Sequence, residues 1–138
     1  LLKQLAIFRG GFTRDAVSKI IGASLRLLVR LVDKSLLYRS ESGRYNMHQL
    51  LRQYVTEQPA GGVDLSRLHE SFSHYFTQLA KDAYAKYLTG SYENSLAEID
   101  ADFGNIRSSW LLMVQAIRDR QASEAQVKRL QQLVDPLD

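Results

Sequence analysis

The stretch that decides the fold is residues 24–58, SLRLLVRLVDKSLLYRSESGRYNMHQLLRQYVTEQ. Its first part is predicted to be a helix, because apolar residues recur there at helical spacing behind Ser24, a residue type that caps helix N-termini. The positions predicted to form its buried stripe are Leu25, Leu27, Leu28, Val29, Leu31, Val32 and Leu36. The narrow strip left for solvent holds Arg26, Arg30, Asp33 and Lys34. The helix is therefore expected to be mostly buried.

Two short strands and a second helix are predicted to follow. Residues 36–39 and 44–47 flank the polar loop 40–43, which ends in glycine and suits a hairpin. From Gln49 onward the helical period returns, and residues 59–62, with one proline and two glycines, end it. The apolar positions of this second helix are Leu50, Leu51, Tyr54 and Val55.

Two further helices are predicted upstream. Residues 1–8 are mostly apolar and precede the break Arg9-Gly10-Gly11. Thr13 can cap the next helix, and Gly22 stands where a left-handed C-terminal cap is wanted. The inward positions of that helix are Ala16, Val17, Ile20 and Ile21. Three helices, a hairpin and a helix form the winged variant of the helix-turn-helix arrangement, so the sequence predicts a winged-helix domain over 1–58.

The rest of the chain predicts a mainly α fold throughout, with a linker over 59–64 and an antiparallel helical bundle over 65–138. Asp64 can cap a long helix, which ends at Thr89-Gly90. The apolar positions of that helix are Leu65, Leu68, Phe72, Tyr75, Phe76, Leu79, Ala80, Ala83, Tyr84 and Tyr87. No internal repeat of 34 residues is found, so periodicity does not establish tetratricopeptide repeats.

Three shorter helices complete the predicted bundle. The first is built on Leu96, Ile99 and Phe103, and the second on Ile106, Trp110, Met113, Val114 and Ile117. The third begins with the capping pattern of Ser123 and Gln126 and is expected to stop at Pro136. Asp100 and Asp102 lie at a predicted helix junction, where capping is the commoner role for carboxylates.

Several stretches resemble the winged-helix domain of bacterial signal-transduction ATPases with numerous domains (STAND, NB-ARC-like). These are residues 5–12 (LAIFRGGF), 31–37 (LVDKSLL) and 43–54 (GRYNMHQLLRQY). Residues 88–90 and 102–110 (DFGNIRSSW) resemble the helical segment that leads into the tetratricopeptide repeats of such regulators. The resemblance implies a longer parent chain, in which a P-loop nucleotide-binding domain using ADP or ATP with Mg²⁺ and a repeat sensor are this segment's partners.

The resemblance also implies a function. The chain is expected to be a regulatory interaction fragment of a nucleotide-switch signalling protein or transcriptional regulator, coupling the nucleotide-binding core to the repeat sensor. It contains no Gly-x-x-x-x-Gly-Lys-Ser/Thr loop, so the fragment itself is not expected to be an enzyme, while the parent is expected to be an ATPase. A DNA-binding winged-helix module and a purely structural helical scaffold are the alternatives.

His48 is the residue to which the resemblance assigns a ligand. In that family a Met-His-Asp triplet follows the second wing strand, and its histidine contacts the β-phosphate of bound ADP. Here the triplet is Met47, His48 and Gln49. The resemblance therefore implies the family's phosphate contact for His48 but no family role for Gln49. The alternative is that His48 begins a helix and satisfies only local backbone groups. No cofactor is expected in the fragment alone.

The charge of the chain is divided unequally. Residues 1–58 hold ten Lys or Arg against four Asp or Glu, a net of +6, and residues 59–138 hold eight against eleven, a net of −3. A DNA-reading surface would use Arg26, Arg30, Lys34, Arg39 and Arg44. Asp33 on the same helix face would repel phosphate, and an ordinary solvated surface explains the charge equally well. Contact with DNA, direct or indirect, stays open.

The composition of the chain argues against several other classes of protein. There is no cysteine, so no disulfide framework can form, which fits a reducing cytoplasm. Neither a signal peptide nor a run of 18 or more apolar residues is present, so no membrane partner is expected. His48, His69 and His74 lack metal-site spacing, so no metal is expected. The chain opens without Met inside an apolar stretch and is expected to be an excised fragment.

Overall fold

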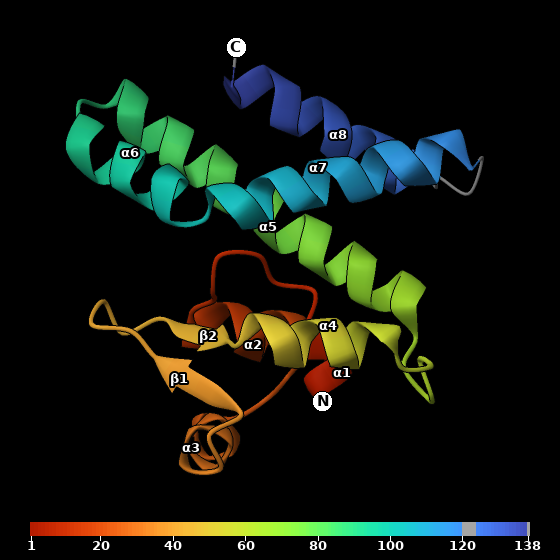
Figure 1. Ribbon diagram of the computed structural model, residues 1–138. Coiled ribbons are helices and arrows are strands. Elements are labelled where there is room, and N and C mark those ends of the chain that lie inside the picture. Colours follow the sequence, from red (N-terminus) through yellow and green to blue (C-terminus); the bar gives the residue numbers. More distant parts are fainter. Residues whose placement is uncertain (120–123, 138) are drawn as a thin grey trace. The chain divides into compact units, whose positions relative to one another are not determined.

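The computed structural model describes residues 1–119 and 124–137 (Figure 1). The chain is mainly α with one small antiparallel hairpin in the described ranges, as the sequence predicts. Contacts between residues divide it into two compact units, Leu1–Leu68 and His69–Asp138. The predicted cap formed by Ser123 lies outside the described residues. Each unit is built around its own apolar core.

The first unit contains the predicted order of three helices, a hairpin and a helix. Its elements are α1 (Leu2–Leu5), α2 (Arg14–Ile20), α3 (Leu25–Asp33), β1 (Leu37–Arg39), β2 (Tyr45–Met47) and α4 (Gln49–Glu57). Both predicted N-terminal caps are confirmed. The Thr13 hydroxyl accepts from the Ala16 amide at 3.1 Å, and the Ser24 hydroxyl accepts from the Leu27 amide at 3.3 Å. These bonds satisfy amides that the first helical turn leaves without partners.

The hairpin is also confirmed, and it gains a neighbour that the sequence did not predict. Leu37 pairs with Met47 and Arg39 with Tyr45, and Gly43 turns the loop with a positive φ of 83°. Phe12, ahead of α2, forms an isolated antiparallel bridge with Tyr45. The Phe12 ring centroid lies 4.8 Å from that of Phe8. The hairpin is thereby tied to the buried aromatic core of the first unit.

Two predicted buried faces in this unit are wrong in part. In α3 the residues that face the core are Leu28 and Leu31, whereas Leu25 is 37% and Val29 46% exposed. In α4, which is also a short helix, Val55 is buried, Leu51 is half-buried, and Leu50 and Tyr54 are 81% and 62% exposed. The reason is geometric, because each helix buries only one narrow row of side chains in this small unit. The helix α3 is therefore not mostly buried.

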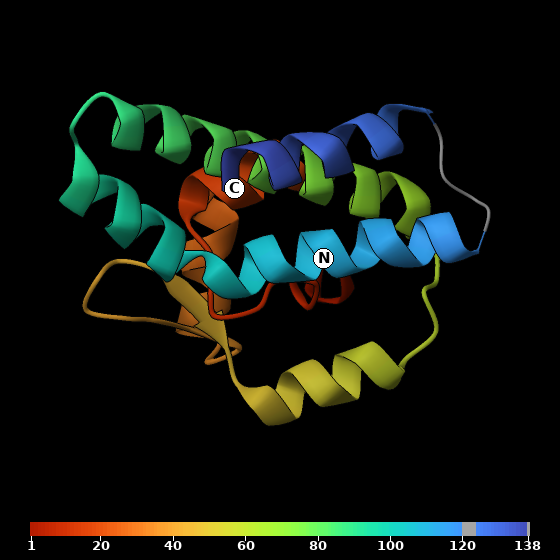
Figure 2. The same cartoon turned by 90° about the horizontal axis from the view of Figure 1, so that it is seen from above.

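The second unit is helical in its described residues. The helix α5 (Leu65–Leu88) begins in the first unit and is followed by α6 (Tyr92–Ala101), α7 (Phe103–Arg118) and α8 (Glu124–Leu137). Asp64 caps α5 as predicted, because its carboxylate accepts from the Arg67 amide at 3.1 Å. Figure 2 shows α7 running opposite to both α5 and α8. The core side chains of this unit include Phe72, Phe76, Ala80, Ala83, Ile106, Met113 and Leu133.

Several expectations for this part of the chain need correction. Leu65, Tyr87 and Ile117 lie on predicted apolar faces, but they are 40%, 41% and 39% exposed. Leu96 and Phe103 were predicted to be inward positions, but each is 58% exposed. Instead Ser95 in α6 and Asn105 in α7 are both fully buried. The helix α8 continues to Leu137 and so passes Pro136.

Asp102 lies at the junction between α6 and α7, as the sequence predicts, but its side chain does not cap a backbone amide. Its carboxylate accepts instead from the Asn105 side-chain amide at 3.1 Å, and both residues are buried. Within the described ranges, no group of three or more His, Cys, Asp or Glu side chains could hold a metal ion. No helix there combines the length and apolar character that crossing a bilayer requires.

Candidate phosphate-contact site at the hairpin–helix junction

His48 occupies the single position between β2 and α4. It is the N-cap residue of α4 with an extended backbone (φ −57°, ψ 140°), and its carbonyl accepts from the Arg52 amide at 3.0 Å. Its side chain makes no capping hydrogen bond and is exposed. The imidazole is therefore not used to satisfy backbone amides of the helix.

The ring of Tyr38 positions the imidazole. Tyr38 lies in the middle of β1, and its ring centroid is 4.7 Å from that of His48 with an angle of 37° between the planes. Aromatic rings at this separation attract each other by about 0.5–1.5 kcal/mol beyond the area they bury. Because Tyr38 is itself 44% exposed, the pair lies at the surface. An outside group can reach the imidazole N–H there.

Arg52 is a residue of this junction that sequence reasoning missed. It follows His48 by four residues, and Tyr38, whose ring lies beside the His48 imidazole, also acts on the charge of Arg52. Its pKa is lowered, first by burial and then by the positive charge of Arg9, while Tyr38 acts in the opposite direction. The buried Arg52 Nε has no hydrogen-bond partner in the described part of the chain. The i, i+4 spacing from His48 was the signal that could have found it.

The local electrostatics favour an anion. Arg52 is half-buried, and the ionisable groups that shift its pKa are Arg9 and Tyr38, with no carboxylate among them. A negatively charged ligand beside Arg52 would offset the repulsion from Arg9. Gln49, the third residue of the triplet, is exposed at the first position of α4 and adds no negative charge. Phosphate oxygens are acceptors of the kind that imidazole and guanidinium groups bind.

The cations proposed for DNA contact lie in two places. Arg26 and Arg30 are exposed along α3, and Lys34 is the exposed C-cap residue of that helix. Arg39 is exposed at the end of β1, with its guanidinium carbon 5.8 Å from the centre of the Tyr45 ring, a cation–π distance. Arg44, half-buried, directly precedes β2. Two of the five residues therefore belong to the wing, two to α3 and one, Lys34, to the C-terminal cap of α3.

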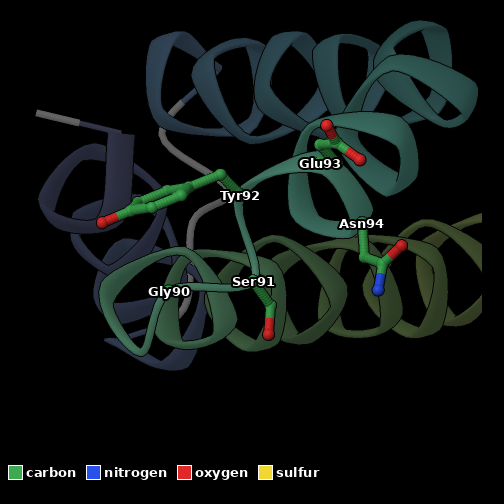
Figure 3. Close-up of a pocket in the computed structure, with 5 residues that line it drawn as sticks. All are labelled: Gly90, Ser91, Tyr92, Glu93 and Asn94. Carbon is green, nitrogen blue, oxygen red and sulfur yellow. The ribbon is translucent and has the colours of Figure 1, made fainter.

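A surface hollow of about 350 Å³ lies elsewhere, where α6 begins, and is lined by Gly90 to Asn94 (Figure 3). The labelled side chains of Ser91, Tyr92 and Glu93 point in different directions. Because they do not converge on one point, this hollow offers no set of groups that could hold a ligand. The junction at His48 is the better candidate site.

Comparison with known proteins adds no relative. No protein-family model, no curated protein and no solved structure matches this chain. The assignment of His48 therefore rests on the resemblance of its sequence motif and on the geometry of the junction.

Proposed function

We propose that this chain is a regulatory segment of a nucleotide-switch protein, in which the first unit is a winged-helix module that contacts a phosphate of ADP bound to a P-loop domain of the same parent. The observation that carries the proposal is the state of His48. Its imidazole is exposed at the start of α4, is not used as a helix cap, and is held beside Tyr38. The second unit then couples the module to a repeat sensor.

The proposed contact is physically sufficient for a switch. An imidazole N–H that donates to a phosphate oxygen contributes about 1.5–3 kcal/mol, as hydrogen bonds to charged groups do. This contact exists only in the closed, ADP-bound packing, so it shifts the equilibrium toward that state. Leu50 and Tyr54, which are 81% and 62% exposed on α4, supply apolar area for the partner domain to cover.

The test is the rate at which the full-length parent releases ADP. His48→Ala should speed ADP release by roughly tenfold or more, because it removes a contact of about 1.5–3 kcal/mol and about 1.4 kcal/mol corresponds to a factor of ten. It should also raise the signalling output of the parent protein in the absence of its stimulus. Gln49→Asp, which restores the family triplet, should leave release unchanged or slow it. The matched control is His74→Ala, which removes an exposed imidazole from α5 and should have no effect on release.

Two results would contradict the proposal. Equal ADP release rates for the parent and its His48→Ala variant, with unchanged basal output, would make His48 a local structural residue and favour the scaffold alternative. Sub-micromolar ADP binding with turnover by the 138-residue chain alone would show that the nucleotide site lies in this segment. Because the chain contains no P-loop sequence, calorimetric titration of the 138-residue chain should show neither ADP binding nor nucleotide turnover.

DNA binding is the second candidate, because Arg26 and Arg30 on the third helix of the unit and Lys34 at its C-terminal cap are all exposed. Asp33 is exposed on the same helix and weakens attraction to phosphate. Binding driven only by counterion release should be insensitive to sequence and steeply lost with added salt. A sequence-specific complex that survives physiological salt and fails on Arg30→Ala would place DNA reading first.

A further inference from the structure

Arg52, near the start of α4, is a half-buried cation with a donor that is left unpaired. Its Nε is buried and makes no hydrogen bond within the described ranges. No carboxylate is among the groups that act on its charge. Buried donors in folded proteins are nearly always paired, because an unpaired one has lost its hydrogen bonds to water without replacing them. An unpaired guanidinium nitrogen of this kind therefore calls for a functional explanation.

Three segments of the first unit bring groups together around Arg52. Arg9, which follows α1, acts on the charge of Arg52, and its guanidinium is held by two backbone carbonyls at 2.7 and 3.3 Å. Tyr38 of β1 also acts on Arg52, and the Tyr38 ring lies 4.7 Å from the ring of His48. Tyr38 is thus a common neighbour of Arg52 and of the exposed imidazole at the start of α4.

This arrangement is unfavourable for the chain by itself and favourable for binding an anion. Burial and the charge of Arg9 both lower the pKa of Arg52, which means that both act against its charged form. Arrangements of this kind are concentrated at functional sites. A phosphate group offsets both effects, because it carries negative charge and presents several acceptor oxygens to the planar fork of a guanidinium.

We propose that Arg52 is the second phosphate-binding residue of the hairpin–helix junction, and that its guanidinium and the His48 imidazole donate to oxygens of one phosphate group. Arg9, whose guanidinium is held by backbone carbonyls, adds attraction at longer range. The identification of this group as the β-phosphate of ADP rests on the proposed function. The anion site itself depends only on the contacts of the first unit.

Titration of the 138-residue chain with inorganic pyrophosphate tests the anion site. In heteronuclear NMR spectra at constant ionic strength, the Arg52 Nε–H signal should shift and saturate, while that of Arg30, an exposed cation of α3, should shift little. Arg52→Met removes the donors and should raise the dissociation constant, followed at the His48 backbone amide, by about tenfold or more. The matched control, Arg30→Met, should leave the constant unchanged. Equal constants for the two variants would overturn the proposal.

Stability without ligand separates a binding role of Arg52 from a structural one. Arg52→Met removes an unpaired donor and the repulsion from Arg9, so the midpoint of urea unfolding should rise or stay the same. Pyrophosphate should raise the midpoint of the unsubstituted chain more than that of the Arg52→Met variant, because a ligand that binds only the folded state stabilises it. A lower midpoint for Arg52→Met without pyrophosphate would make Arg52 a structural residue and overturn the proposal.

The full-length parent distinguishes failure of this inference from failure of the proposed function. Both His48→Ala and Arg52→Met should speed ADP release. Faster release for His48→Ala alone would leave the proposed function in place and overturn the role of Arg52 toward ADP. Unchanged release for both variants would overturn the proposed function, and the pyrophosphate titration would then decide the anion site by itself.

Discussion

The backbones of Phe12 and Tyr45 exchange two hydrogen bonds, because the amide of each donates to the carbonyl of the other at 2.9 Å. This bridge adds a third short segment to the hairpin and joins the chain ahead of α2 to the wing. The two rings are stacked with centroids 6.1 Å apart. Gly11 lies directly before this bridge with a φ of +86°, so the wing and the glycine pair are structurally coupled.

Gly11→Ala should destabilise the first unit more than Gly10→Ala. Both glycines have positive φ, a conformation that costs other residues about 1–2 kcal/mol. A Cβ at Gly11 would also lie 2.6 Å from the Asn46 side-chain oxygen and 3.0 Å from the Tyr45 carbonyl, whereas a Cβ at Gly10 meets nothing within 4 Å. Urea unfolding followed by circular dichroism should give a loss of about 3 kcal/mol or more at Gly11. Equal losses for the two variants would show that the bridge tolerates displacement.

Lys3→Met should loosen the end of α4. The Lys3 ammonium donates to the carbonyls of Val55, Thr56 and Gln58 at 3.2, 2.8 and 2.6 Å, at the C-terminal end of α4, where the helix lacks further amides to bond its last carbonyls. The Val55 carbonyl also accepts from the Gln58 amide at 3.2 Å. The loss should be about 1 kcal/mol, with faster amide exchange in the last turn of α4. The matched control is Lys19→Met, which breaks only an exposed ion pair with Asp15 and should cost less than about 0.5 kcal/mol. A larger loss at Lys19 would refute this role of Lys3.

His69 should make stability depend on pH. Burial lowers the pKa of His69 from its ordinary value of 6.5, because the charged imidazolium is disfavoured there. As pH falls from 6.5 toward the lowered pKa, the unfolded chain binds a proton that the folded chain does not, so the free energy of unfolding decreases. Above 6.5 this contribution is fully present and constant. His69→Gln should remove this part of the slope in urea unfolding measured across that range.

The control for His69 is His74→Gln, which removes an exposed imidazole from the same helix. This variant should show the same dependence of unfolding free energy on pH as the unsubstituted 138-residue chain. If the unsubstituted 138-residue chain and the His69→Gln variant give parallel curves of unfolding free energy against pH, burial of the His69 ring does not make stability depend on pH.

Asp102→Ala should destabilise the second unit, whereas Asp100→Ala should not. Asp102 is 7% exposed, and its carboxylate accepts from the fully buried Asn105 amide at 3.1 Å. Losing a buried hydrogen-bond partner costs about 1–3 kcal/mol, while changes at exposed positions such as Asp100 stay within about 0.5 kcal/mol. Fluorescence of Trp110, the single tryptophan, reports unfolding of α7. Similar midpoints for the two alanine variants would count against the Asp102 contact.

The sequence by itself determined the local parts of this protein. Thr13, Ser24 and Asp64 cap helices where they were predicted, and the loop ending at Gly43 joins strands that agree with the prediction to one residue. These features depend on groups a few residues apart, so local chemistry fixes them. The position of His48 between strand and helix follows from the same elements.

Only the tertiary structure decided which side of each amphipathic helix is covered. Periodicity shows that Leu25, Val29, Leu50 and Leu96 lie on apolar stripes, but it does not show whether another element packs against them, and none covers them fully in their own units. The bridge from Phe12 to Tyr45 and the effect of Arg9 on Arg52 join residues distant in the chain. Such contacts depend on how the elements pack, and a local sequence pattern does not determine that packing.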